Sequence, residues 1–180
     1  MRVIAGSAKG RRLAPVPKGT RPMADRAREG LFSSLGPAVE DAAVLDLYAG
    51  TGALAIEALS RGAASAELVD SSEAAIRTIR ENLSRAGFEA RVRRTAAARY
   101  LASPRGPFDL VFLDPPYETP EADIRAVLEA LPASLAPRAT GVLTRPARNT
   151  TDVIPVHFVT TRRLAYGDAL VLVFREERWA

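Results

Sequence analysis

Short apolar runs alternate with longer amphipathic segments over most of the chain. The candidate strands lie at residues 44–47, 66–70, 90–93, 110–113 and 141–144, and most of them are apolar. Between them, residues 53–61, 73–86 and 121–131 repeat apolar side chains at the three- and four-residue spacing of a helix with one buried face. Short strands that alternate with such helices predict an α/β protein with a parallel sheet and crossover connections.

This alternation stops after residue 145. Residues 156–164 and 169–174 are instead predicted as two strands joined through Tyr166-Gly167-Asp168, which is a hairpin signal. The sheet would therefore have seven strands and end in an antiparallel pair.

A basic segment precedes the sheet. Residues 2–5 and 11–14 flank a turn at residues 6–10, which predicts a small β-hairpin, and residues 24–35 are predicted as a helix. We expect a basic arm at residues 1–22 and one larger domain at residues 23–180.

The composition limits the class of protein. The 180 residues are 47% hydrophobic and 26% charged, which suits a single globular core. The apolar runs are far shorter than the roughly 20 residues that cross a bilayer, and the first residues lack a secretory signal, so we expect a soluble cytoplasmic protein. We also expect a monomer. The absence of cysteine excludes disulfides, thiolate metal sites and a cysteine nucleophile.

Positive charge is concentrated near the N-terminus. The net charge is +4 and the sequence pI is about 9.9. Residues 1–30 hold only Asp25 and Glu29 as acids, against these basic residues: Arg2, Lys9, Arg11, Arg12, Lys18, Arg21, Arg26 and Arg28. A basic arm on a nearly balanced body indicates a polyanionic partner such as a nucleic acid.

A glycine-containing loop follows the first predicted strand of the sheet. It reads Asp46-Leu47-Tyr48-Ala49-Gly50-Thr51-Gly52 and opens a helix. Open α/β sheets bind ligands at this edge, but the third glycine of a dinucleotide-binding loop is replaced by Ala55. Asp46 suits a ligand with a cationic amino-acid tail, and Asp70 after the second strand suits ribose hydroxyls. Together they predict a site for S-adenosylmethionine, whereas a tight turn with capping acids is the structural alternative.

The fourth predicted strand delivers Asp114-Pro115-Pro116-Tyr117 to the same edge. Two prolines stiffen the loop and remove two amide donors, so the Asp114 carboxylate and the Pro115 carbonyl are fixed acceptors. If each accepts one N–H of a base amine, the nitrogen lone pair is free to attack a methyl group. Tyr117 can stack on an extruded base. Methylation at pyrimidine C5 needs a thiolate, which this chain lacks, so the motif favours an amino nitrogen.

With these motifs in place, the chain resembles the RsmD-type family of ribosomal RNA methyltransferases. The matching stretches are residues 2–6 with 9–11, 20–22 with 25–29, 46–52 with 56–63, 82–83, 108–117 and 166–168. The resemblance implies a Rossmann-like, S-adenosylmethionine-dependent class I methyltransferase fold with no metal. It also implies methylation of the N2 amino group of guanine 966 in 16S ribosomal RNA, free or in a small-subunit assembly intermediate.

The resemblance implies roles for individual residues. The catalytic residues would be Asp114, Pro115 and Tyr117. The cofactor-binding residues would be Asp46, Tyr48, Gly50, Gly52 and Asp70. The RNA-binding residues would be Arg2, Lys9, Arg11, Arg12, Arg21 and Arg26.

Three positions depart from the family pattern. Thr95-Ala96-Ala97-Ala98 lacks the acid expected next to adenine, Met23 replaces a threonine, and Thr144-Arg145 stands where the fifth strand usually ends in glutamate. Two other functions stay open at this point. One is a DNA adenine-N6 methyltransferase, which would use the same Asp-Pro-Pro-Tyr chemistry. The other is an RNA-binding ribosome-assembly factor without activity.

Overall fold

A seven-stranded sheet forms the centre of the computed structural model, which describes residues 1–14, 23–103, 105–148 and 153–177. The strand order is β3-β2-β1-β4-β5-β7-β6. The strands are β1 (Ala43–Leu47), β2 (Ser65–Asp70), β3 (Arg91–Arg94), β4 (Phe108–Leu113), β5 (Leu135–Pro146), β6 (Phe158–Tyr166) and β7 (Ala169–Glu176). β1 to β5 pair in parallel, and β7 runs antiparallel to both β5 and β6. The predicted seven strands and antiparallel ending are confirmed.

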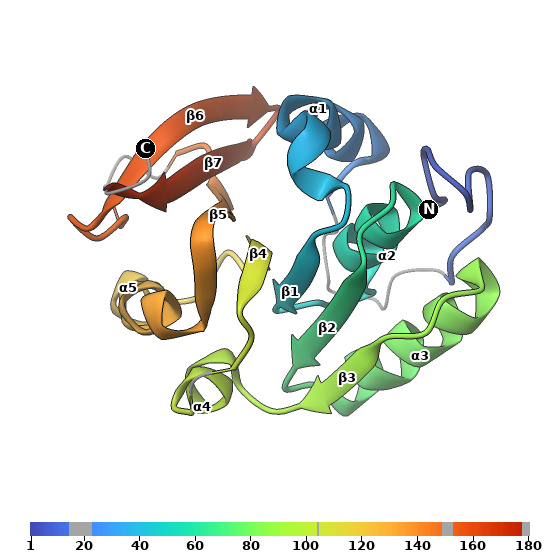
Figure 1. Cartoon of the computed structure of the whole chain (residues 1–180), viewed down its shortest axis with the longest axis horizontal. Coiled ribbons are helices and arrows are strands. Elements are labelled where there is room, and N and C mark those ends of the chain that lie inside the picture. The colour runs from blue at the N-terminus through green and yellow to red at the C-terminus, as the bar shows by residue number, and fades with distance from the viewer. Residues whose placement is uncertain (15–22, 104, 149–152, 178–180) are drawn as a thin grey trace.

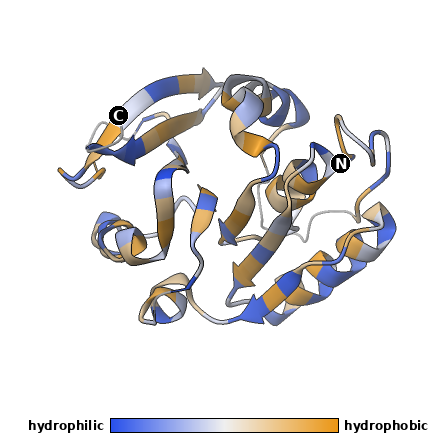
Figure 2. Ribbon diagram, in the orientation of Figure 1, coloured by the Kyte–Doolittle hydropathy of each residue, from blue (hydrophilic) through white to orange (hydrophobic). Residues whose placement is uncertain are grey.

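Helices cover both faces of the sheet, in three layers (Figure 1). They are α1 (Asp25–Leu35), α2 (Ala53–Ser60), α3 (Glu73–Ala86), α4 (Ala97–Leu101) and α5 (Glu121–Ala130), with short 3₁₀ turns η1 (Gly36–Val39) and η2 (Leu131–Ser134). An apolar cluster lies on each face of the sheet. One packs the sheet against α1, α2 and α3, and the other packs it against α4 and α5. Apolar colouring accordingly gathers on the central strands and on one stripe of α3 (Figure 2).

Four predicted helices are confirmed, and α4 was not foreseen. It has only five residues, so it is too short to show a periodic pattern. β6 also begins two residues later than predicted, because Phe158 N donates to Pro155 O in a turn that leaves Val156 92% exposed.

The N-terminal arm folds back on itself, but the predicted hairpin is reduced to a single antiparallel bridge between Arg2 and Arg12. Val3 N donates to Arg11 O at 3.0 Å. The next two amides, of Ile4 and Ala5, donate to the Glu57 side chain and not to a neighbouring strand. The arm is thus tied to the body of the protein instead of forming regular strands of its own.

Candidate active site

The carboxyl ends of the central parallel strands bring the predicted site residues to one edge of the sheet. Leu47 of β1 is in register with Val69 of β2 and with Leu113 of β4. Asp70 and Asp114 are the next residues after these two partners, so both lie level with the start of the glycine loop. Sequence reasoning therefore placed the two acids and the loop together correctly.

The loop between β1 and α2 turns through unusual backbone conformations. Tyr48, Gly50 and Gly52 all have positive φ, at 61°, 56° and 76°. A side chain at Gly52 would also meet Leu68 Cδ2 at 2.9 Å, so only glycine fits there. Tyr48 is not a glycine, and a left-handed conformation at such a residue is typical of sites where the surroundings hold the backbone for a function.

Asp70 supports this loop directly. One of its carboxylate oxygens accepts from Gly50 N at 2.9 Å, and the other accepts from Ser72 N at 2.8 Å, just before α3. The sequence predicted Asp70 only as a ribose ligand. In the structure the same carboxylate also fixes the loop, while each oxygen keeps a second lone pair for a ligand.

Asp46 is the buried acid of the site. Its side chain is 1% exposed, and Oδ2 accepts from Ala55 N at 3.2 Å. Oδ1 is buried and has no hydrogen-bond partner within the described chain. Burial, opposed by the hydrogen bond from the Ala55 amide and reinforced by the nearby carboxylates of Asp114 and Asp70, raises the pKa of Asp46 to about 8. A buried carboxylate oxygen without a partner, beside two more acids, is a place where a cationic ligand group gains a strong contact.

Asp114 lies at the start of the proline-rich loop. Burial raises its pKa to about 6, and the Thr144 side chain from β5 opposes that rise. Pro115 is buried and Tyr117 is half-buried, while Thr119 N donates to Pro116 O at 2.9 Å and closes the loop into a turn. At neutral pH the Asp114 carboxylate is mostly ionised, so it acts as a hydrogen-bond acceptor.

Two of the positions expected to depart from the family pattern lie at the end of β5, where Thr144 is level with Asp114. Thr144 is the β5 residue beyond the Leu113–Leu143 pair, and Arg145 follows it. Arg145 is 3% exposed, and its Nη2 lies 3.5 Å from Oε1 of Glu121 in the first turn of α5. This ion pair ties the end of β5 to the helix that follows the proline-rich loop.

Five of the six predicted RNA-binding residues lie in the described part of the chain. Arg2, Lys9, Arg11, Arg12 and Arg26 are exposed, as an RNA contact requires. Arg21 lies outside the described residues. Arg28, although basic and in the same region, is 1% exposed.

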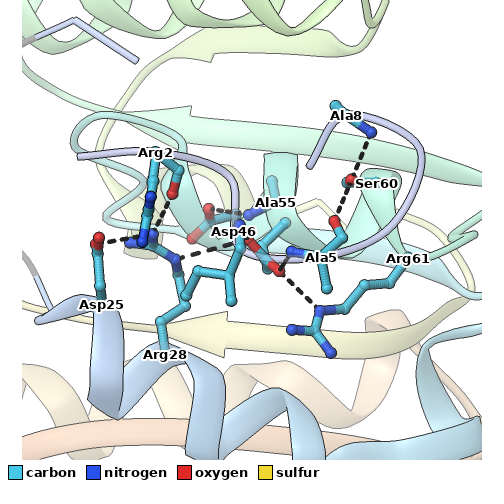
Figure 3. A network of polar contacts seen from close by, with 11 residues as sticks. Arg2, Ala5, Ala8, Asp25, Arg28, Asp46, Ala55, Ser60 and Arg61 are labelled. Carbon is cyan, nitrogen blue, oxygen red and sulfur yellow. Dashed lines mark hydrogen bonds and ion pairs between the residues drawn. The ribbon is translucent and has the colours of Figure 1, made fainter. Parts of the chain in front are cut away.

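Arg28 and Glu57, which are not among the predicted site residues, hold the arm in place. Figure 3 shows Arg28 and Arg61 beside the arm residues Arg2 and Ala5. Glu57 on α2 is 1% exposed; Oε2 accepts from Ile4 N at 2.8 Å and Oε1 from Ala5 N at 3.0 Å. Arg61 Nε lies 2.8 Å from Oε1, and Arg28 Nε lies 3.8 Å from Oε2. Arg28 also donates through Nη2 to the Arg2 carbonyl at 2.6 Å.

Ser60 adds a second attachment on the same helix, since its hydroxyl accepts from Ala8 N at 2.9 Å and donates to Ala5 O. At Gly6 any side chain would collide with the Ser60 carbonyl. The only sequence signal for these contacts is a glutamate among the apolar residues of α2.

Neither a metal site nor a membrane span accompanies these residues. Among the described residues, no three histidine, cysteine or acidic side chains are grouped so as to hold a metal ion. In the same part of the chain, no helix is both long and apolar enough to cross a bilayer. The strand order, the glycine loop and the acids at the sheet edge define a Rossmann-like class I methyltransferase domain.

Comparison with known proteins specifies the family. A family model described as "Conserved hypothetical protein 95", the RsmD family, matches residues 1–175, and the chain belongs to this family. It is 46% identical over 121 residues to "Ribosomal RNA small subunit methyltransferase D" of Escherichia coli K12, a match that covers 65% of this chain and 60% of that protein's length.

Two further relatives extend the comparison. The "Putative rRNA methyltransferase YlbH" of Bacillus subtilis is 42% identical over 134 residues, which cover 71% of this chain and 72% of that one. The solved structure of the "Putative methyltransferase yhhF" from Escherichia coli superposes with a TM-score of 0.87 at 34% identity and covers 98% of both chains.

Proposed function

We propose that this protein transfers a methyl group from S-adenosylmethionine to the exocyclic N2 of a guanine in 16S ribosomal RNA, at position 966. The observation that carries the proposal is the unpartnered buried oxygen of Asp46 beside Asp114, at the edge where a cationic methyl donor and a target amine would meet. The names of the relatives favour small-subunit RNA, free or in an assembly intermediate, over DNA.

The cofactor side of the site uses residues that the chain already holds in place. Asp46 would meet the cationic amino-acid end of the donor, and Asp70 would accept from its ribose hydroxyls. Tyr48, Gly50 and Gly52 would supply the close-fitting loop. When bound, S-adenosylmethionine provides an electrophilic methyl group on a sulfonium, a leaving group that needs no further activation.

The target side positions the nucleophile. The ionised Asp114 carboxylate and the Pro115 carbonyl each accept one N–H of the base amine, which keeps the lone pair out of the ring system and aims it outward. The proton that the nitrogen loses as the N–C bond forms passes to Asp114, because a carboxylate with a pKa of about 6 is an effective base near neutral pH. Tyr117 stacks on the face of the base.

The arm supplies the RNA surface. Its exposed cations, with Arg21 and Arg26, would contact phosphates and orient the RNA over the sheet edge, a contribution that weakens as salt is added.

Labelled methyl transfer tests the proposal. Small-subunit RNA from cells that lack this gene, large-subunit RNA and double-stranded DNA are each incubated with the protein and labelled S-adenosylmethionine. We expect label in the small-subunit RNA alone. Label in DNA would favour the adenine-N6 function, and calorimetry with S-adenosylhomocysteine that shows no binding would favour an assembly factor without activity.

A further inference from the structure

Asn82 connects the N-terminal arm to the cofactor loop. It lies in the middle of α3 and is completely buried. Its Oδ1 accepts from Ala14 N at 2.6 Å, and its Nδ2 donates to Thr51 O at 2.8 Å. Ala14 belongs to the arm and Thr51 stands between the two glycines of the loop, so a single side chain contacts both regions.

The contact with Thr51 complements the one made by Asp70. Asp70 accepts from the Gly50 amide, and Asn82 donates to the carbonyl of Thr51, the next residue of the loop. Thr51 is buried, and a buried carbonyl without a donor is costly. The loop also contains three residues with positive φ, a conformation that persists only where the surroundings hold it. The two side chains therefore hold the peptide group before Gly50 and the peptide group after Thr51.

The contact with Ala14 determines which way the Asn82 amide faces. If the amide were rotated by half a turn, its NH₂ group would point at the Ala14 N–H and its oxygen at the Thr51 carbonyl, and both hydrogen bonds would become repulsive contacts. The Ala14 amide thus selects the orientation in which Asn82 donates to the loop. The arm contributes to the geometry of the cofactor site in this way, although it lies outside the sheet.

We propose that Asn82 is a positioning residue that makes the N-terminal arm a structural part of the cofactor site. The arm then has two functions: its exposed cations face the RNA, and its backbone at Ala14 orients the side chain that holds the glycine loop. This inference rests on the proposed function, because it takes the loop to be the binding site for S-adenosylmethionine.

Calorimetry with S-adenosylhomocysteine on the full-length chain tests the inference. Asn82→Asp keeps an acceptor for Ala14 N but offers no donor to Thr51 O, and Asn82→Ala removes both contacts. We expect each variant to raise the Kd about tenfold, since the loop carbonyl loses its buried donor. Ser60→Ala is the matched control, because Ser60 also binds the arm backbone but contacts no loop residue in the described structure. Its Kd should stay within about twofold of wild type.

A kinetic measurement separates positioning from general damage to the fold. Asn82→Asp should raise the KM for S-adenosylmethionine about tenfold and leave kcat at saturating cofactor within about twofold, because the Asp114 side of the site is untouched. Should the charged variant fail to fold, Asn82→Ser supplies the same test with a smaller, uncharged side chain.

The possible outcomes are distinct. A wild-type protein that does not bind S-adenosylhomocysteine would overturn the proposed function itself. A wild-type protein that binds, together with folded Asn82 variants whose Kd and KM match wild type, would overturn the inference alone. Equal weakening in Ser60→Ala and Asn82→Ala would also contradict it, because the effect would then come from a loosened arm and not from the contact with the loop.

Discussion

Two buried acidic side chains on neighbouring elements have opposite hydrogen-bonding and charge surroundings. Glu57 on α2 and Asp46 on β1 are each 1% exposed. Both oxygens of Glu57 accept backbone amides of the arm, and two arginines surround them. Asp46 has one hydrogen bond, a second oxygen without a partner in the described chain, and two more acids beside it.

This difference separates an acid that stabilises the fold from an acid that suits a ligand. A buried charge that the chain itself saturates stabilises the fold, because its removal leaves partners unpaired. A buried acid that the chain leaves half-satisfied lowers the stability of the fold and is retained for a ligand that completes it. Glu57 therefore attaches the arm, and we propose that Asp46 binds the cofactor.

The largest effect should come from a change at Asp114, the acid that we propose faces the target base. Asp114→Ala should lower the rate of methyl transfer by about 10²–10⁴-fold, since the acceptor and base for the amine is gone. Its Kd for S-adenosylhomocysteine should stay within about threefold, because Asp114 lies on the target side. Single-turnover transfer of labelled methyl and calorimetry measure the two quantities, and unchanged labelling would refute the role of Asp114.

Glu57→Gln should unfold far more easily than wild type. The substitution breaks the fully buried pair of Arg28 and leaves it only the half-exposed Asp25 as an acidic partner, and breaking a buried ion pair costs about 3–5 kcal/mol in the free energy of unfolding. Urea denaturation measures this loss. Glu81→Gln is the control, because the exposed Glu81–Arg85 pair is worth at most about 0.5 kcal/mol. Equal stability of the two variants would remove the distinction between Glu57 and a surface acid.

Asp46→Asn should have the opposite effect on stability and should weaken ligand binding. The amide has the same shape and does not have to take up a proton on folding, so the variant should be more stable than wild type at pH 7. Its affinity for S-adenosylhomocysteine should fall about tenfold to a hundredfold, because a charge-assisted contact with the ligand is lost. Denaturation and calorimetry check the two signs. A variant that loses stability as Glu57→Gln does would show that Asp46 is structural.

The pH dependence of stability sharpens the same comparison. The pKa of Asp46 is raised from 3.8 to about 8 on folding, so the folded protein holds a proton that the unfolded chain releases between these values. The contribution of Asp46 to stability is therefore complete below about pH 4 and is lost as pH rises to about 8. Relative to Asp46→Asn, wild type should lose stability between pH 5 and 8 in urea titrations. A constant difference across that range would contradict the raised pKa.

The smallest effect should follow from changes at the exposed surface of the arm. Replacing Arg11 and Arg12 by glutamine should weaken RNA binding several-fold at low salt and flatten the dependence of affinity on salt, since each lost phosphate contact lowers the slope by about one. Filter binding over a salt series measures both quantities. The Glu57 contacts are untouched, so the unfolding free energy should stay within about 0.5 kcal/mol. An unchanged salt slope would show that RNA binds elsewhere.

Most of the fold, and the residues at the sheet edge, could be predicted because their signals lie within short segments of the sequence. The central strands β1 and β4 are largely apolar runs, and the residues at the carboxyl ends of parallel strands all reach the same edge, so Asp70, Asp114 and the glycine loop could be placed from the sequence. The five residues of α4 carry no comparable pattern. The arm was foreseen as a hairpin because its own residues suggest one, whereas its amides bind a helix more than 50 residues away.

Glu57 and Asn82 illustrate why the remaining site residues could not be identified. Glu57 binds the amide of Ala5, which is 52 residues away, and Asn82 binds the amide of Ala14, which is 68 residues away. Contacts between residues so far apart produce no recognisable pattern in the sequence. The available signal is a polar residue on a helical stripe that should be apolar: Glu57 beside Ile56, and Asn82 between Ile79 and Leu83. A buried polar side chain needs partners, but the sequence does not say which.

Mass spectrometry of 16S ribosomal RNA tests the central claim most directly. RNA from cells that lack this gene is treated with the protein and S-adenosylmethionine, digested and compared with untreated RNA. We predict one added methyl group on the N2 of guanine 966 with wild type and none with Asp114→Ala. A methyl group on another base or another atom, or the same modification with Asp114→Ala, would contradict the account.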